Sequence, residues 1–502
     1  MQLLQRLYQT VLCSTKAAKI TMSLCRGTCL FLSLLIVSAA GPFYVSLAGN
    51  DSWTGLLPLP TPSRDNGPFR TPARAATALS SLSRPLLTDI YVYLRGGVYQ
   101  LDETLTLGVD QSGSGQSASV HWSTYPGDEP AVLSGSLGIA DADWKPGAGG
   151  AWVAPLPPAA PNRSRALRIQ GFDRRWPARV PSVAGPGLDG LYNDDATLHW
   201  ASSLTGCGIT ECWPQNCSDP INQWGFVYNA SDVRGPSPSW IDIPGIDALV
   251  FGSWTASWAP VRAVVGANDS LLVGAPLRTS APGHWGGIGC PSGARYVLSN
   301  VAEALAPGTF YVNDSARAIA YVPYPSEDPT TLRASVPALA VVVEVGSGAQ
   351  FITLENLSIF GASDGGLLVS AYTDPLGAVL VTGAADVTLL NLSVFGTDGS
   401  GICLGDVSRV TVNRCLVTDA GGDGVGNSGV WTNVTVSNST TNSTGFLFLD
   451  QPSGIRTSGA VDGVVTVTQN LVLDSAHNGI AVTGPGVTAP PLGTPFRFIV
   501  TF

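Results

Sequence analysis

The chain has 502 residues, of which 44% are hydrophobic and only 12% are charged. This composition is sufficient for a large core and excludes a disordered protein, and the scarcity of charge disfavours coiled coils and long solvated helices. Glycine and proline number 58 and 37, which predicts frequent turns. The net charge of −10 argues against nucleic acid as a partner, because neutralising phosphates requires a basic surface.

The N-terminal segment, residues 1–40, has no acidic side chain, and its apolar run Leu30–Val37 is followed by Ser38-Ala39-Ala40. This pattern predicts a secretory signal peptide cleaved after Ala40, and hence a secreted or extracellular protein. The run is shorter than the ~20 apolar residues that span a bilayer. Because the leader is long, an uncleaved signal anchor remains an alternative, and the protein would then be attached to a membrane. Translation starting at Met22 is a second alternative.

Sequons and cysteines also fit export. Asn-x-Ser/Thr sequons, the acceptors of N-glycosylation, occur at Asn50, Asn162, Asn216, Asn229, Asn268, Asn313, Asn356, Asn391, Asn433, Asn438 and Asn442. The cysteines beyond the leader are Cys207, Cys212, Cys217, Cys290, Cys403 and Cys415. Their even number permits disulfides in a secreted chain, and we expect the first four to pair among themselves. A zinc site is a weaker interpretation, because no histidine stands at ligand spacing.

Residues 41–135 are predicted to form a strand-rich N-terminal module with one helix. Apolar alternation predicts strands at 43–45, 90–94 and 98–107, and another strand begins at Val120. The Ala-rich stretch 71–83 opens with Thr-Pro and has helical spacing, which predicts a helix.

Residues 136–335 show no repeat and predict an irregular, β-rich inserted domain, because short apolar runs alternate there with Pro, Gly and Asn. Several tryptophans in it are candidates for stacking on sugar rings, although burial in a core is the commoner role of this residue. These are Trp240, Trp254, Trp258 and Trp285.

Residues 336–486 are periodic. The segment 352–361, ITLENLSIFG, recurs as 387–396, VTLLNLSVFG, and β-branched runs begin again at Val410 and Val434, so the starts are 35, 23 and 24 residues apart. Each unit ends in glycine followed by an aliphatic residue, as at Gly366-Leu367, Gly401-Ile402, Gly424-Val425 and Gly479-Ile480. Short strands with this period and no intervening helix predict an all-β solenoid with coils stacked in register, and a parallel β-helix fits best.

Several motifs resemble a known group of proteins. Those of the N-terminal module are Leu94-Arg95-Gly96-Gly97-Val98-Tyr99, Glu103-Thr104-Leu105, Tyr125-Pro126-Gly127-Asp128-Glu129-Pro130 and Leu133-Ser134-Gly135. They are similar to the N-terminal module of secreted right-handed parallel β-helix proteins, and resemble the glycoside hydrolases of the α-fucosidase/xylanase-like β-helix group. Ala178-Arg179-Val180-Pro181 and the segment from Arg295 to Tyr311 resemble two further motifs of this group, with Thr309 and Phe310 in place of its Glu and Trp.

The resemblance covers about 43–485 and implies a right-handed parallel β-helix that acts on a polysaccharide or other glycan. Members of the group continue into further coils that carry more acidic residues. Here the resemblance stops near Gly484, and an irregular Pro-rich tail follows over 487–502. We therefore expect part of the usual active-site cleft to be missing.

Alignment of the coils on the Gly-aliphatic pairs predicts an acidic edge, since equivalent residues of adjacent coils lie about 4.8 Å apart. The residues of this edge are Asp364, Asp398, Asp419, Asp423, Asp474 and His477. Neighbouring carboxylates raise one another's pKa, which separates an acid from a base, and glycoside hydrolysis commonly uses such a pair. The Gly-Gly-Asp-Gly turn at Asp423 and the coil at His477 also match recurrent features of the group. We therefore predict Asp398, Asp419, Asp423 and Asp474 as candidate catalytic carboxylates, assisted by His477.

Other interpretations stay open. Aspartate is a favoured turn residue, so the same edge is compatible with a non-catalytic glycan-binding or cell-surface protein. It also offers oxygen ligands for Ca²⁺, whereas no other metal or cofactor is predicted. A polysaccharide lyase is a further alternative, but it requires a basic residue in the cleft, and lysine is scarce in this chain.

Overall fold

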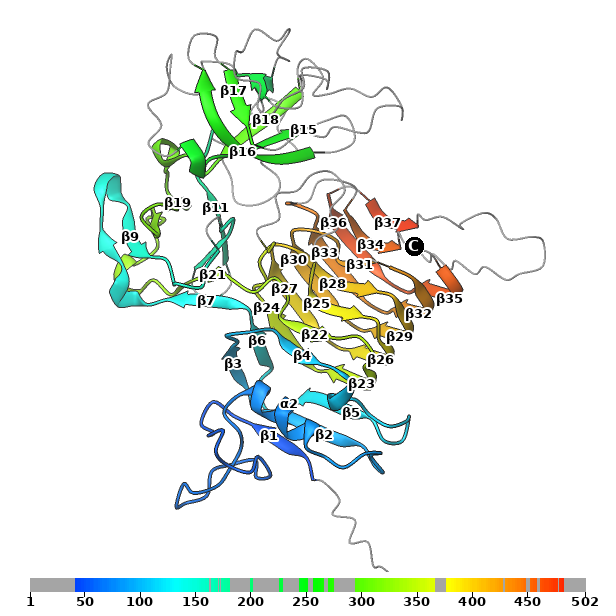
Figure 1. Cartoon of the computed structure of the whole chain (residues 1–502). Coiled ribbons are helices and arrows are strands. Elements are labelled where there is room, and N and C mark those ends of the chain that lie inside the picture. Colours follow the sequence, from blue (N-terminus) through cyan, green and yellow to red (C-terminus); the bar gives the residue numbers. More distant parts are fainter. Residues whose placement is uncertain are drawn as a thin grey trace, which may run out of the picture. The chain divides into compact units, whose positions relative to one another are not determined.

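The computed structural model describes residues 41–161, 164–169, 171, 173–180, 199–201, 225–228, 243–251, 256–265, 270–274, 294–365, 376–427, 429–447, 452–457, 461–476 and 478–482. The leader, the tail, the first four cysteines beyond the leader, and Trp240, Trp254 and Trp285 lie outside these residues. No helix in the described ranges is long and apolar enough to cross a membrane. Within them the protein is mostly β-strand (Figure 1).

Three sheets, called here A, B and C, consist of parallel strands, and within each sheet the strands stack one after another along the molecule (Figure 1). In the described residues, sheet A has the order β1 (Phe43–Val45), β2 (Ile90–Leu94), β5 (Val120–Thr124), β23 (Gln350–Glu355), β26 (Ala385–Leu390), β29 (Val407–Asn413), β32 (Trp431–Ser437) and β35 (Val461–Thr468). Sheet B has the order β3 (Gly97–Gln100), β6 (Ala131–Ser134), β24 (Leu357–Phe360), β27 (Ser393–Thr397), β30 (Leu416–Ala420), β33 (Thr440–Thr444) and β36 (Leu471–Ser475). Sheet C has the order β4 (Leu105–Leu107), β22 (Val343–Val345), β25 (Gly377–Thr382), β28 (Ser400–Gly405), β31 (Val425–Asn427), β34 (Ser453–Thr457) and β37 (Asn478–Val482).

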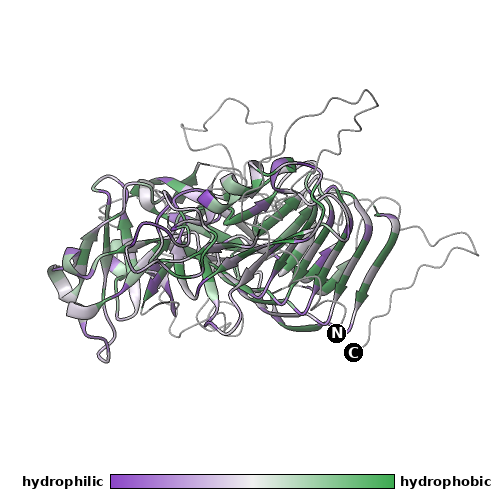
Figure 2. Cartoon of the chain, turned by 90° about the horizontal axis from the view of Figure 1, so that it is seen from below, coloured by the Kyte–Doolittle hydropathy of each residue, from purple (hydrophilic) through white to green (hydrophobic). Residues whose placement is uncertain are grey.

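The chain passes from sheet A to B to C and then returns to A, and one such passage is called a coil below. The pairing has the predicted register, because Ile352 lies beside Val387 and Val387 lies beside Val410. Inward-facing aliphatic side chains of successive coils form buried columns, and hydrophobic residues accordingly follow the stacked strands in Figure 2. One such column consists of Ile90, Val120, Ile352, Val387, Val410, Val434 and Val465. The predicted stacking of parallel strands is thus confirmed.

The turn from sheet A to sheet B uses one residue of left-handed backbone conformation in each repeating coil. These residues are Asn356, Asn391, Arg414, Asn438 and Gln469. Asparagine adopts this conformation more readily than most L-residues, which explains its recurrence there. The Asn391 side-chain amide also donates to Oδ1 of Asn356 at 2.8 Å, so a short amide ladder runs along the turn.

Helix α2 (Pro72–Ser80) packs against β4, the terminal strand of sheet C. The Thr71 hydroxyl accepts from the Arg74 N–H at 3.2 Å, and Pro72 occupies the first turn, as expected of a helix N-terminus. Ala75 and Leu79 are fully buried. The helix begins where the sequence predicts and ends three residues earlier, at Ser80. It shields one sheet end from further strand pairing.

Two more sheets, D and E, are built from strands between β6 and β22 and are mainly antiparallel. In the described residues, sheet D has the order β7 (Ser136–Ile139), β21 (Ala334–Pro337), β10 (Leu167–Ile169), β11 (Asp173–Pro177), β19 (Thr309–Asn313), β20 (Ala318–Tyr321), β9 (Trp152–Pro155) and β8 (Lys145–Pro146). Sheet E has the order β12 (Arg179–Val180), β18 (Ala294–Ser299), β15 (Asp247–Phe251), β16 (Ala256–Val265), β17 (Ser270–Val273) and β14 (Gly225–Val227), with β13 (His199–Ala201) beside β18. Short 3₁₀ turns lie at Val109–Gln111, Asp141–Asp143, Ala148–Gly150, Ile243–Gly245, Ala302–Ala304 and Pro329–Thr331.

The segment with sheets D and E therefore leaves its coil at the turn between sheets B and C. Both ends of it are held at one point, since the Gly135 carbonyl accepts the N–H groups of Ala338 and Leu339, each at 3.0 Å. Its position brings sheet D to the turn at which the predicted acidic residues occur.

Candidate functional site

The turn from sheet B to sheet C, called here the B–C corner, carries every described member of the predicted acidic edge. Asp364 lies between β24 and β25, Asp398 between β27 and β28, and Asp423 between β30 and β31. Asp419 and Asp474 belong to the ends of β30 and β36. The predicted histidine of this edge, His477, lies outside the described residues.

Two of these carboxylates share one arginine of sheet D. The Arg174 guanidinium of β11 donates through Nη1 to Oδ1 of Asp398 and through Nε to Oδ1 of Asp419, both at 2.9 Å. Arg168 of β10 lies opposite Arg174 in the antiparallel pair, and its Nη1 donates to Oδ2 of Asp419. Sheet D thus places two guanidinium groups over two carboxylates of adjacent coils.

Aromatic rings surround these arginines. The Arg174 guanidinium carbon lies 4.2 Å from the centroid of the Phe446 ring and 5.2 Å from that of Trp176. The two rings meet edge to face, with centroids 5.5 Å apart. These contacts hold the guanidinium in place by packing and cation–π attraction.

A third arginine pairs with the carboxylate of the preceding coil. Nη1 of Arg165 lies 2.6 Å from Oδ2 of Asp364, and its Nε lies 3.7 Å from Oδ2 of Asp247 in sheet E. The Trp258 ring lies beneath the same guanidinium, and the Trp258 indole N–H donates to the Leu447 carbonyl at 2.7 Å. Trp258, a candidate for sugar stacking, is therefore buried between sheet E and the coils.

Asp423 has a different environment, because its partners come from the next coil. Its Oδ2 accepts from Nε of Arg456 at 2.7 Å, and its Oδ1 accepts from the Ser453 N–H at 2.8 Å. Its own N–H donates to the Ser400 hydroxyl at 3.0 Å. The side chain therefore ties three coils together in the manner of a structural turn aspartate.

Burial separates the acidic residues into two groups. Asp398 and Asp423 are 2% exposed and Asp364 is 6% exposed, whereas the Asp419 side chain is 33% exposed. Asp474 is exposed. Burial raises the pKa of Asp398, and Arg174 and Arg168 only partly oppose this effect. Among these carboxylates, Asp419 combines solvent access with contacts to the buried cluster.

Asp474 lies farther from Asp419 and Asp423 than the sequence alignment implies. One coil, made of β32, β33 and β34, intervenes, and its Gly454-Ile455 pair aligns with Gly424-Val425 and Gly479-Ile480. Asp419 and Asp474 nevertheless occupy the same corner position, which Ser443 holds in the intervening coil, and all three have positive φ. Because adjacent coils are about 4.8 Å apart, the backbones of Asp419 and Asp474 are separated by about 10 Å, two coil steps.

The corner does not fit a bound dication. No cluster of three or more His, Cys, Asp or Glu side chains in the described ranges has the arrangement of a metal site. Asp364, Asp398, Asp419 and Asp423 each contact a guanidinium group, and these cations would repel Ca²⁺. Cys403 and Cys415 are both buried, and burial raises the pKa of Cys415 to about 11.

The sequence did not identify the arginines as site residues. Arg165, Arg168 and Arg174 lie in the non-repetitive segment, and their partners are 199 to 251 residues away. The available signal was the density of arginine in RSRALRIQGFDRRW, residues 163–176. By contrast, Arg95 of the N-terminal module pairs with Asp128 of the same module, which makes it a structural residue.

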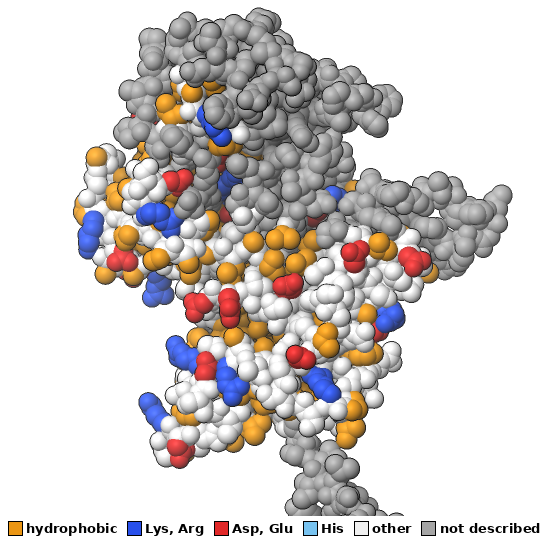
Figure 3. Space-filling view, in the orientation of Figure 1, with side chains coloured by type: hydrophobic (Ala, Val, Ile, Leu, Met, Phe, Trp, Pro, Cys, Tyr) orange, Lys and Arg blue, Asp and Glu red, His pale blue; other side chains and the backbone are white. Residues whose placement is uncertain are grey.

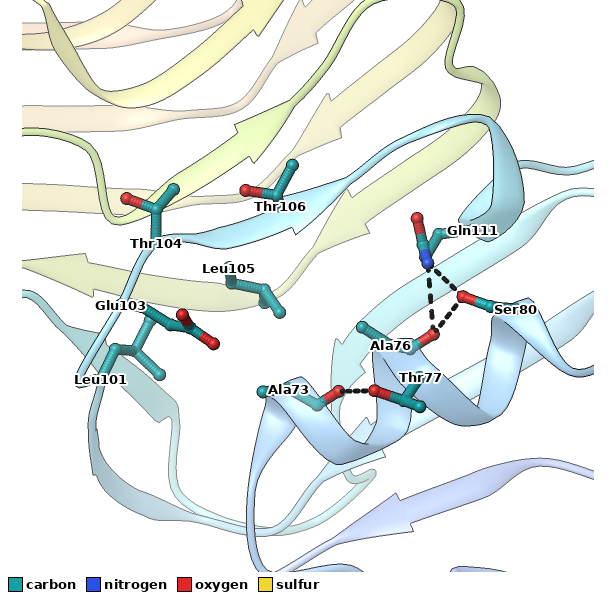
Figure 4. A pocket seen from close by; sticks show the side chains of 10 residues that line it. All are labelled: Ala73, Ala76, Thr77, Ser80, Leu101, Glu103, Thr104, Leu105, Thr106 and Gln111. Carbon is teal, nitrogen blue, oxygen red and sulfur yellow. Dashed lines mark hydrogen bonds between the residues drawn. The ribbon is translucent and has the colours of Figure 1, made fainter.

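The surface of the described residues shows no single-charge patch on the face in view (Figure 3) and one hollow away from the corner. On the face seen in Figure 3, acidic and basic side chains are interspersed over the described residues. A separate hollow of about 400 Å³ lies between α2 and the segment Leu101–Thr106, with Gln111 at its rim (Figure 4). Glu103 is the one carboxylate among its lining residues, so it lacks the pair that glycoside hydrolysis uses.

The described residues define a mostly β protein with stacked parallel strands. A solved structure described as a glycoside hydrolase aligns over 90% of this chain and 98% of its own, with a TM-score of 0.58 and 15% identity. The complex of XylC with xylose aligns over 88% of this chain and 63% of its own, with a TM-score of 0.42 and 12% identity. The GH136 lacto-N-biosidase from Eubacterium ramulus aligns over 88% and 55%, with a TM-score of 0.33 and 10% identity. No family model and no curated protein matches the chain.

Proposed function

We propose that this protein is a secreted, right-handed parallel β-helix protein of the glycoside hydrolase type, which acts on a polysaccharide or other glycan. The observation that carries the proposal is the Asp398–Arg174–Asp419 cluster at the B–C corner, in which one guanidinium joins a buried and a partly exposed carboxylate. The fold similarity to a glycoside hydrolase and the leader pattern support it.

The two carboxylates have the different environments that acid–base catalysis needs. Burial raises the pKa of Asp398, which favours its protonated form and suits a general acid. Asp419 is reachable from solvent and is held by two guanidinium groups, which suits a base or nucleophile. Together they would protonate the leaving oxygen and attack, or activate water at, the anomeric carbon.

The test is the release of reducing sugar from a panel of polysaccharides. Asp419→Asn should lower the rate by about 10²-fold or more, whereas the control Asp474→Asn, at the equivalent corner position two coils away, should retain activity. Far-UV circular dichroism and the thermal midpoint establish that both variants are folded. Equal activity of Asp419→Asn and the wild-type protein would remove this residue from the mechanism.

The deep burial of Asp364, Asp398 and Asp423 favours a second candidate, a non-catalytic glycan-binding protein. In that case the ion pairs only attach sheets D and E to the coils. Glycan binding without any released sugar, for the wild-type protein as for Asp419→Asn, would identify it. A lyase has less support, because the arginines of the corner are engaged by carboxylates rather than available to a substrate.

A further inference from the structure

The outer face of sheet A carries a cluster of aromatic rings that the acidic corner does not use. Tyr91 stacks on Tyr93 with centroids 5.4 Å apart and on His121 at 4.7 Å. Tyr44 stacks on Tyr93 at 5.9 Å, and Tyr125 meets Tyr93 edge to face at 5.8 Å. All five side chains are partly exposed. They form a continuous platform over β1, β2 and β5.

This platform continues into a column of hydroxyl groups. Tyr91 and His121 occupy the same register position of neighbouring strands in sheet A. In every later coil of the described chain, this outward-facing position is a threonine. These residues are Thr353, Thr388, Thr411, Thr435 and Thr466. The parallel spacing puts successive hydroxyl groups about 4.8 Å apart. The face therefore combines an aromatic end with a regular row of donors and acceptors.

The charge of this face differs from that of the acidic chain as a whole. Its tyrosine and threonine side chains carry no formal charge, and charged side chains beside them lie in pairs of opposite charge, Arg95 with Asp128 beside Tyr125 and Arg409 with Asp386. Glu355 faces His121 at 3.8 Å. Burial raises the pKa of Tyr44 and of Tyr93, so their hydroxyl groups remain uncharged. A face of this kind is complementary to a neutral ligand rather than to a polyanion or a basic peptide.

We propose that the tyrosine platform and threonine column bind an extended, neutral polysaccharide chain, at a surface separate from the B–C corner. The stacked tyrosine rings present their apolar edges and their hydroxyl groups to the sugar rings of such a chain, and the threonines offer hydrogen bonds along it. The proposal depends on the proposed function only for the class of ligand, a glycan, because it requires no cleavage.

Affinity electrophoresis in native gels tests the proposal. The wild-type protein should be retarded by soluble neutral polysaccharides, namely xylan, β-glucan or galactomannan, and not by polygalacturonate. The double variant Tyr91→Thr/Tyr93→Thr, which gives position 91 the residue type of the later coils, should weaken retardation by at least about tenfold in apparent Kd, since a few aromatic anchors dominate such interfaces. Asp419→Asn should be retarded like the wild-type protein, and this separates the surface from the cleavage site.

A second measurement uses the wild-type protein alone, in case the double variant does not fold. Diethyl pyrocarbonate modifies accessible histidine, and the retarding polysaccharide should slow labelling of His121 as followed by mass spectrometry. The proposal is overturned if no neutral polysaccharide retards the wild-type protein, if the folded double variant is retarded equally, or if His121 labelling is unchanged at saturating polysaccharide.

Discussion

At the residue scale, Arg174 determines how the B–C corner is neutralised. Its side chain is 7% exposed, and its guanidinium contacts both Asp398 and Asp419. Removal of one member of a buried ion pair leaves the other charge desolvated, which typically costs about 3–5 kcal/mol. An exposed pair contributes little, because water and salt screen it.

Replacement of Arg174 should therefore be far more destabilising than replacement of an exposed arginine. We expect Arg174→Met to lower the free energy of unfolding by about 3 kcal/mol or more. The matched control Arg409→Met removes the pair with Asp386, in which Arg409 is 55% exposed, and should cost below about 1 kcal/mol. Urea unfolding of both variants checks the difference, and equal costs would show that the corner is not electrostatically coupled.

The pH dependence of stability should have opposite signs at two aspartates. Because burial raises the pKa of Asp398, its contribution is full below the ordinary aspartate pKa of about 3.9 and is lost as the pH rises through the raised pKa. The hydrogen bond from Arg95 lowers the pKa of Asp128, so that contribution is present above about 3.9 and is lost as the pH falls through the lowered pKa.

Urea unfolding across this pH range checks the two signs. The advantage of the wild-type protein over Asp398→Asn should shrink as the pH rises above about 4, and its advantage over Asp128→Asn should shrink as the pH falls below about 4. Parallel pH profiles for the two differences would refute the assigned environments.

At the scale of the strand and turn, the recurrent glycines of the B–C corner have a steric explanation. A Cβ at Gly424 would lie 2.5 Å from the Gly454 carbonyl oxygen and 2.6 Å from Cγ2 of Thr441. The strand of the following coil therefore approaches too closely for a side chain. The predicted pairs at Gly401 and Gly424 mark this close approach, and the aliphatic residue that follows each glycine faces the core.

Gly424→Ala should consequently destabilise the protein, by about 1–3 kcal/mol from overpacking. Gly115→Ala is the control, since nothing lies within 4 Å of a Cβ at that position, and its effect should be within about 0.5 kcal/mol. Thermal midpoints of the two variants measure the difference. A Gly424→Ala protein as stable as the wild type would mean that the coils separate easily at this turn.

The strand register was largely predictable, and the acidic site only in part. Pairing of Ile352 with Val387 follows from their repeated sequence context, because identical alternation buries identical faces. The first strand of one coil was predicted from the run at Val434, but the Gly454-Ile455 pair of that coil escaped prediction, since the run between them, Thr440–Thr444, is polar and lacks the aliphatic pattern of the other coils. That omission displaced Asp474 by one coil in the predicted edge.

At the scale of the whole folded chain, sheets D and E are an insertion whose arginines neutralise the coils. Both ends of the insertion meet at Gly135 and Ala338, so a short linker in place of 136–337 should close the coil. We expect the shortened protein to retain a β-strand circular dichroism spectrum. Asp364, Asp398 and Asp419 would then face water instead of the guanidinium groups of the insertion.

The same substitution, made in the full chain and in the shortened protein, measures how much the insertion contributes to the stability of the corner. Asp364→Asn should cost about 2 kcal/mol or more in the full chain, where it leaves Arg165 without its 2.6 Å partner. In the shortened protein the same change should stay within about 0.5 kcal/mol. Equal costs in both would show that the stability of the corner does not depend on the insertion.

The period of the coils, the buried aliphatic columns and the alignment of the aspartates along one turn are encoded locally, because each coil repeats its own pattern and stacks on the next. The neutralisation of those aspartates is not encoded locally. It arises because the insertion folds back over the turn from which it leaves, bringing Arg165, Arg168 and Arg174 to carboxylates about two hundred residues away. Periodicity in one segment carries no information about the partners that another segment supplies, so folding alone determined which carboxylate is buried and which remains exposed to solvent.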